Sequence, residues 1–478
     1  MTLLALPAGL LLPTLCGWLL LRLLEGKHAV LYRTERWVTG CVLGLTSTMF
    51  VSFVLQVTLN VPFSFIGFGT AQLGLAILLG ALWYAKRSTL GPSPLPAHSI
   101  LSRWQAIGLG TLLTLLVAKI VLAGATFLIL TPTYLQDTLK NWNLRGKVFY
   151  ETEMLTLVMP NEDPLVSPRD ISSYPPTVPM IKTWLADIAG TWDEALVNSI
   201  HIVWYLAALL LLFYAVRRYA SLPWALLGTY ILGSLPLYLM HGTNAYADAF
   251  VSVHILLAIS FVLHAMRAHG AMQRMAWFRL AALATCLIPL TKNEGILVHL
   301  PPLLLVTALL LLGLRRFGQI SSKQLFTAVG WYALLGLLPA FWLGFKWVRG
   351  LTFGNGKPFT SLGFGWQENV LYAVTINTFA EGNWLLLFPF FFGLLVWRFK
   401  TALGELLPLT AFVLIVYFGQ MALYLFTGLS TEALMQTGYA RGLVQLAPTI
   451  VLLTTLLLHD AWPTIGRSFG ALRMRKAD

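Results

Sequence analysis

Stretches of about 20 apolar residues, the length that a helix needs to cross the hydrocarbon core of a bilayer, recur along almost the whole chain and constrain its fold. One such run is LLALPAGLLLPTLCGWLLLRLL, near the N-terminus. Of the 478 residues, 57% are hydrophobic and only 11% are charged, which is unlike a soluble domain. The runs also lack the alternating polarity of β-barrel strands. The chain is therefore predicted to be all-α, a polytopic transmembrane helix bundle.

The apolar runs predict about 13 membrane-spanning helices. They cover residues 2–23, 38–58, 62–85, 105–130, 199–216, 222–240, 246–265, 276–290, 294–313, 325–346, 381–397, 405–427 and 442–460. Lys and Arg gather in alternate connections, which places the N-terminus outside by the positive-inside rule. The net charge of +13 follows from these short basic connections and does not indicate nucleic-acid binding.

The longest connection, residues 131–198, is predicted to lie on the non-cytoplasmic side. It divides the chain into an N-terminal three-helix transmembrane segment (1–104), a transmembrane core that contains this loop (105–347), and a C-terminal loop with further helices (348–478). Loops of this length usually have a function. Acidic residues are concentrated in it: Asp137, Glu151, Glu153, Glu162, Asp163, Asp170, Asp187, Asp193 and Glu194.

Two amphipathic helices are expected inside this loop. In DTLKNWNLRGKVFYE, the helical spacing places Asp137, Asn141 and Arg145 on one polar face. The apolar face of the same helix, expected to rest on the bilayer, carries Leu135, Leu139, Trp142 and Phe149. A second helix follows YPPTVP, with a buried stripe of Val178, Ile181, Leu185 and Ile188. The two helices would form a lid over a cavity between the spans.

Asp137 has a second interpretation, because a carboxylate at the start of a helix also interacts favourably with the helix dipole. A capping role is the better explanation for Asp193 and Glu194, which precede the next span.

Short outward connections add ionisable residues at the same rim of the membrane: Asp248, Lys292, Glu294 and Arg441. Ionisable groups at membrane depth are costly and usually face a cavity or a partner, so this rim is a candidate functional site. A local salt bridge or helix start also fits Lys292 and Glu294, and interfacial snorkelling also fits Arg441. Lys119 lies deep in a span and requires a polar partner that the sequence does not identify.

Taken in order, DTLKNWNLRGKVFYE, YPPTVPMIKTWLA, NAYADAF and TKNEGILV resemble the GT-C superfamily of membrane glycosyltransferases, closest to its protein O-mannosyltransferase and aminoarabinose transferase branch. TEALMQTGYARGLVQLAP is a weaker match near the C-terminus. The chain departs from that family in having four predicted spans before the loop, where relatives usually have one. It also has Gln136 before Asp137, where many relatives have a pair of acids.

The resemblance implies an inverting transfer of a sugar from a polyprenyl-phosphate donor to a lipid, glycan or protein acceptor. Asp137 would be the general base, and Lys292 and Arg441 would bind the lipid phosphate. Asp248 would orient sugar or acceptor hydroxyls. The remaining candidates for substrate binding are Asn141, Arg145, Tyr174 and Glu294.

The expected location is the bacterial inner membrane, with the active site facing the periplasm. Paired His or Cys ligands and a phosphate-binding glycine loop are lacking, so neither zinc nor a nucleotide donor is expected. A loosely held divalent ion remains compatible with the sequence. A membrane transporter or lipid flippase is the alternative function, although the two halves show no repeat. A structural subunit without catalytic activity is a third candidate function.

Overall fold

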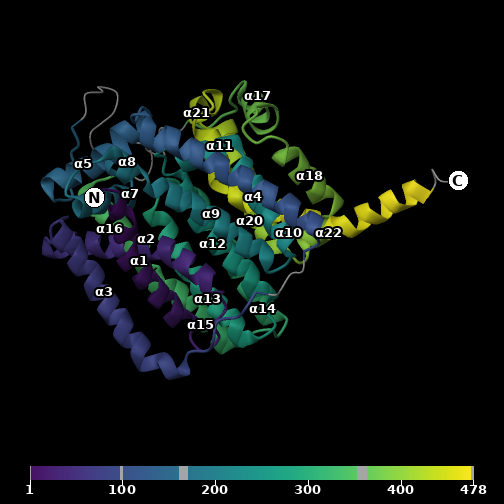
Figure 1. The fold of residues 1–478 in the computed structure, drawn as a ribbon, viewed down its shortest axis with the longest axis horizontal. Helices are drawn as coiled ribbons and strands as arrows, with labels where there is room; N and C mark the ends of the chain where they lie inside the picture. Colours follow the sequence, from purple (N-terminus) through teal and green to yellow (C-terminus); the bar gives the residue numbers. More distant parts are fainter. Residues whose placement is uncertain (1, 97–100, 161–170, 353–362, 475–478) are drawn as a thin grey trace.

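The computed structural model describes residues 2–96, 101–160, 171–352 and 363–474. Within these ranges the chain is a helical bundle, and its only β-type contact is an isolated bridge between Phe364 and Thr427. Figure 1 shows the long helices running side by side, with the short helices α5, α7, α8, α17 and α21 toward one end. The C-terminal half of α22 (Gly438–Met474) extends beyond the bundle.

The helices have the following bounds in chain order: α1 (Thr2–Glu25), α2 (Arg33–Leu59), α3 (Phe65–Lys86), α4 (Arg103–Gly124), α5 (Asn143–Thr152), α7 (Thr177–Ala189), α8 (Glu194–Asn198), α9 (Ile200–Arg217), α10 (Leu222–Ser234), α11 (Pro236–Thr243), α12 (Asp248–Arg267), α13 (Ala271–Leu287), α14 (Leu300–Arg316), α15 (Ser322–Leu335), α16 (Leu337–Arg349), α17 (Val370–Thr375), α18 (Leu387–Trp397), α19 (Phe399–Leu403), α20 (Leu407–Phe426), α21 (Ser430–Leu434) and α22. Short 3-10 or π-helical turns cover Arg87–Thr89, Ala125–Leu130, Thr138–Trp142, Ile288–Leu290, Gly295–His299 and Ile376–Ala380.

All 13 predicted spans contain helix, and the all-α polytopic class is confirmed. Among the described residues, ten helices are long and apolar enough to cross a membrane. The predicted span 222–240 is instead α10 and α11, which meet at an angle of 75° before Pro236. A proline at this position cannot continue the hydrogen bonding of the preceding helix. Two further apolar helical segments, Val370–Ala380 and Leu387–Trp397, are shorter than a full span. The protein is thus an integral, multi-pass membrane protein.

The N-terminal helices α1 and α2 pack closely because glycines line their contact. A Cβ atom on Gly17 would lie 2.0 Å from the carbonyl oxygen of Gly40, and one on Gly44 would lie 2.1 Å from that of Pro13. Close approach of this kind lets the two backbones gain van der Waals contact within a membrane.

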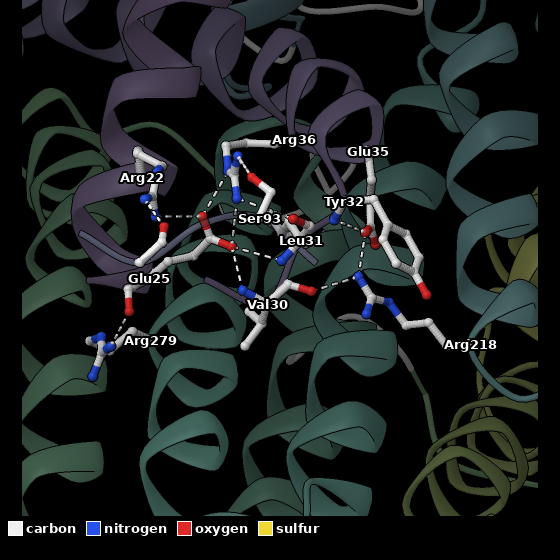
Figure 2. Close-up of polar contacts among 11 residues, drawn as sticks. Arg22, Glu25, Val30, Leu31, Tyr32, Glu35, Arg36, Ser93, Arg218 and Arg279 are labelled. Atoms are coloured by element: carbon white, nitrogen blue, oxygen red, sulfur yellow. Dashed lines mark hydrogen bonds and ion pairs between the residues drawn. The ribbon is translucent and has the colours of Figure 1, made fainter. Parts of the chain in front are cut away.

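A buried ion cluster connects the α1–α2 turn to the end of α9 and to α13 (Figure 2). The Glu25 carboxylate accepts from Arg36 Nε at 2.7 Å. Arg279 of α13 donates to the last carbonyls of α1, including that of Glu25 at 2.9 Å. Arg218, which follows α9, donates to Val30 O at 2.9 Å. These contacts fix the N-terminal helices on α9 and α13.

The loop 131–198 contains the two expected helices, the first through the π-helical turn Thr138–Trp142 and α5, and the second as α7. The apolar face of the first does not simply rest on the bilayer, because Trp142 and Phe149 are buried within the protein. The Phe149 ring lies 5.6 Å from that of Phe63, between α2 and α3. The second helix is also packed inside, and Trp184 Nε1 donates to the carbonyl of Gly9 at 3.0 Å. The loop therefore sits on the ends of the N-terminal helices.

Candidate functional site

A fully buried carboxylate, Asp248, lies at the centre of the candidate site (0% exposed). It is the first residue of α12, which brings it to the end of the bundle where the loop helices lie. Its Oδ1 accepts from Lys292 Nζ at 2.6 Å and from Gln445 Nε2 at 2.8 Å. Its Oδ2 lies 3.0 Å from Arg441 Nε and 3.4 Å from His241 Nδ1. Residues far apart in the sequence therefore meet at one carboxylate.

Arg441 connects this buried carboxylate to Asp137 at the start of the loop. Its Nη1 lies 2.7 Å from Asp137 Oδ2. Asp137 makes no capping hydrogen bond within the described chain, which argues against the interpretation that it only starts a helix. The adjacent Thr138 hydroxyl donates to Ala245 O at 3.1 Å and holds the π-helical turn against the turn between α11 and α12.

Lys292 also reaches Glu294, with Nζ 2.9 Å from Oε1. The local salt bridge considered from the sequence is therefore present, but it is one part of a larger network. Lys292 is 1% exposed, whereas Glu294 is 32% exposed. Asp137 and Arg441 are 40% and 25% exposed. The network thus has a buried part, formed by Asp248 and Lys292. It also has an accessible edge, at which a ligand can contact Asp137, Arg441 and Glu294.

Tyr174 lies beside the network. Its ring packs edge to face on Trp142, with the centroids 5.5 Å apart. Burial, followed by the negative charge of Glu294, raises the pKa of the Tyr174 phenol well above its ordinary value of 10. The phenol is therefore a neutral hydrogen-bonding group at physiological pH.

The segment before Tyr174 is held by Lys346 of α16, a residue that sequence reasoning did not select. Lys346 Nζ donates to Ser173 O at 2.8 Å and to Asn293 Oδ1 at 3.0 Å. Lys346 therefore ties the segment before Tyr174 to the connection between α13 and α14, which carries Lys292.

Asn141 and Arg145 share the predicted helix with Asp137, but among the described contacts they do not join the ion network. Asn141 is buried, and its Oδ1 has no partner within the described chain. Arg145 is buried and donates weakly to Pro175 O at 3.4 Å. Burial lowers the pKa of Arg145 to about 9. Their roles in binding substrate stay predictions.

Two other residues have partners that only the structure identifies. Lys119 Nζ donates to Ser234 Oγ at 3.1 Å and lies 5.1 Å from the centre of the Tyr230 ring, which explains its place in the apolar helix α4. The Asp193 side chain accepts from Leu196 N at 2.9 Å, so its predicted capping role is confirmed.

Sequence reasoning also did not select Gln445 and His241 as site residues. Gln445 lies four residues after Arg441 on α22, and side chains at this spacing share a helix face, so its position could have been recognised. His241 lies in α11, and the short connection between α11 and α12 brings it near Asp248, so its proximity in the sequence could also have been recognised. No group of three or more His, Cys, Asp or Glu side chains suited to a metal occurs in the part of the chain that the structure describes.

Comparison with known proteins supports the fold. No model of a protein family and no curated protein matches the sequence. Among solved structures, the chain is similar to ArnT from Cupriavidus metallidurans in the apo state, with 14% identity and a TM-score of 0.53 over 76% of this chain and 64% of ArnT. The structure of ArnT bound to undecaprenyl phosphate is similar with 15% identity and a TM-score of 0.52, over 75% of this chain and 63% of ArnT. The archaeal oligosaccharyltransferase AglB from Archaeoglobus fulgidus is less similar, with 13% identity and a TM-score of 0.45 over 78% of this chain and 52% of AglB.

The chain therefore shares its fold with ArnT, as the resemblance to membrane glycosyltransferases predicted. The chain spans slightly less than two thirds of the length of ArnT.

Proposed function

We propose that this protein is an inverting GT-C glycosyltransferase that moves a sugar from a polyprenyl-phosphate donor to a lipid, glycan or protein acceptor. The observation that carries the proposal is the Arg441 bridge, because it places a cation between the accessible carboxylate Asp137 and the buried carboxylate Asp248. Cleavage of a sugar phosphate needs a base near the attacking hydroxyl and positive charge near the departing phosphate. Both are available within a few ångströms.

In this reaction the acceptor hydroxyl attacks the anomeric carbon of the sugar. The new bond forms as the bond from that carbon to the phosphate oxygen breaks, and the configuration inverts. Asp137 accepts the hydroxyl proton, and the polyprenyl phosphate leaves with the bonding electron pair. Asp137 is suited to this role because its side chain is 40% exposed at the accessible edge.

The leaving phosphate is assigned to Arg441, which is 25% exposed at the accessible edge, and to Lys292, which is 1% exposed and would act on the phosphate through its positive charge. Both cations are already balanced by carboxylates, Arg441 by Asp137 and Asp248 and Lys292 by Asp248 and Glu294. A donor phosphate at the edge would therefore compete with Asp137 for the guanidinium. This exchange would leave the Asp137 carboxylate available for the acceptor proton when the donor is in place.

The donor's isoprenoid chain would lie among the apolar helices. The similarity of this chain to ArnT bound to undecaprenyl phosphate supports this placement. The reaction is assigned to the periplasmic face of the bacterial inner membrane, where the basic connections predict that the loop 131–198 lies.

The test is incubation of the purified protein with radiolabelled polyprenyl-phosphate sugars and a membrane lipid extract. Transfer of label to a new product by the wild type, but not by Asp137→Asn, is the expected result. Movement of labelled lipid across vesicles without a new product would instead establish a transporter or flippase and overturn the proposal.

A further inference from the structure

Two buried polar side chains, Gln445 and His299, lie directly behind the site. Gln445 lies near the start of α22, and His299 ends the π-helical turn that precedes α14. Both are almost completely buried. His299 Nε2 lies 2.7 Å from Gln445 Oε1, and Gln445 Nε2 lies 2.8 Å from Asp248 Oδ1. His299, Gln445 and Asp248 thus form one hydrogen-bonded line, which ends at the carboxylate in the centre of the network.

The chemistry of the line allows a single arrangement of protons. An ionised carboxylate only accepts hydrogen bonds, so Gln445 must present its amide N–H to Asp248. The amide oxygen then faces His299, which must donate through Nε2. The carboxylate and the donating imidazole thus select the same orientation of the amide, and the amide gives the carboxylate a donor with a fixed direction.

The orientation of that carboxylate matters because its two oxygens have different partners. Oδ1 accepts from Gln445 and Lys292, while Oδ2 faces Arg441. The terminal torsion of an aspartate has a broad energy minimum, so its plane is set by its partners. A rotated carboxylate would no longer hold the Arg441 Nε atom, and the guanidinium would lose its direction toward the accessible edge.

We propose that Gln445 and His299 are positioning residues that fix the plane of the Asp248 carboxylate. Through it they fix the direction in which Arg441 presents its guanidinium to Asp137 and to the donor's phosphate. This inference rests on the proposed function. Neither residue contacts the accessible edge, so both act through Asp248.

The experiment measures binding of undecaprenyl phosphate to the purified full-length protein, together with sugar transfer, in four variants. Gln445→Leu and His299→Leu remove the two donors. His299→Gln keeps a side-chain N–H that can donate to the amide oxygen of Gln445. His254→Leu is the matched control, since His254 is a buried histidine that contacts Thr46 Oγ1 and Phe250 O and is not part of the line.

We expect Gln445→Leu to weaken binding about 10-fold or more, the effect of losing a hydrogen bond to a charged group. His299→Leu, which removes a hydrogen bond to a neutral amide, should weaken binding by about 5-fold. His299→Gln should bind within about 3-fold of the wild type, and His254→Leu should also bind normally. Thermal unfolding of each variant verifies that it is folded, and binding is compared among the folded proteins.

Three results overturn the inference. Normal binding by both leucine variants would show that the line does not position the site, while wild-type sugar transfer would leave the proposed function intact. Equal losses in His299→Gln and His299→Leu would show that the imidazole only fills space. A wild type that binds no undecaprenyl phosphate would overturn both proposals. A wild type that binds it but transfers no sugar would overturn only the proposed function, and the binding data would still decide the inference.

Discussion

The Arg441 guanidinium lies 2.7 Å from Asp137 Oδ2 through Nη1 and 3.0 Å from Asp248 Oδ2 through Nε. One cation thereby joins an accessible carboxylate of the loop to a buried carboxylate of the bundle. This relationship ties the start of the loop to α22 and makes the two assigned roles, proton acceptance and phosphate binding, interdependent.

The first prediction concerns Asp137. Asn is nearly isosteric with Asp but cannot accept the proton, and a positioned base contributes roughly 10²–10⁴-fold in rate. Asp137→Asn should therefore lower turnover by about that factor in a transfer assay, with the fold retained. Asp193→Asn is the control, because Asp193 is a helix cap and Asn caps about equally well. Turnover within a few-fold of the wild type in Asp137→Asn would move the base to another residue, with Asp248 or Glu151 next to be tested.

The second prediction concerns the donor phosphate. Lys292→Gln and Arg441→Gln should each weaken binding of a polyprenyl-phosphate sugar by ~1.5–3 kcal/mol, because each removes a positive charge from the phosphate site. Acceptor affinity should change much less. Lys119→Gln provides a control lysine whose partners, Ser234 and Tyr230, lie outside the network. Unchanged donor affinity in both site variants would exclude the phosphate role.

The third prediction compares a buried glutamate of the cluster in Figure 2, Glu25, with a glutamate on the surface, Glu405. Glu25 is buried and pairs with Arg36 at 2.7 Å, so Glu25→Gln should reduce the free energy of unfolding by about 3–5 kcal/mol by leaving buried positive charge unpaired. Glu405 pairs with Arg267 at 3.0 Å on the surface, and Glu405→Gln should cost about 0–1 kcal/mol. Thermal unfolding in detergent measures both. Equal effects would mean that the cluster does not anchor the N-terminal helices.

The fourth prediction concerns pH. Lys182 of α7 is buried, and burial lowers its pKa from 10.5 to about 7. Between these values the unfolded chain binds the proton and the folded chain does not, so the contribution of Lys182 makes stability rise with pH from about 7 to about 10.5.

Unfolding midpoints measured across that pH range should show this rise in the wild type. It should be smaller in Lys182→Met, whose side chain does not titrate. Lys147→Met, which changes an exposed lysine of the same loop, should keep the wild-type profile. Parallel profiles for the wild type and Lys182→Met would contradict the assignment.

The fifth prediction concerns topology. A cysteine at Met154, which is exposed in the loop 131–198, should react with an impermeant maleimide in intact cells. A cysteine at Phe317, exposed between α14 and α15, should react only after lysis. The wild type gives the background, because Cys16 and Cys286 are buried and Cys41 is partly buried. The reverse labelling pattern would invert the orientation.

Much of the site could be predicted from the sequence because its residues lie where helices start or end. Asp248, Lys292 and Arg441 were selected individually as ionisable groups at the rim of the membrane, and the structure brings all three together. Their partners could not be selected in the same way. Lys346 lies within an apolar helix, and nothing in its neighbourhood in the sequence indicates that it contacts Ser173.

The sequence by itself determined the helical, membrane-spanning class, because hydrophobic length and periodicity are local properties that each segment carries independently. It also determined the two helices of the loop and the capping role of Asp193. Only the tertiary structure decided which charges meet. Asp248 and Arg441 are separated by 193 residues, and their contact depends on how α12 and α22 pack. It likewise decided that Trp142 and Phe149 face the protein interior, because an apolar face specifies burial but not the surface that buries it.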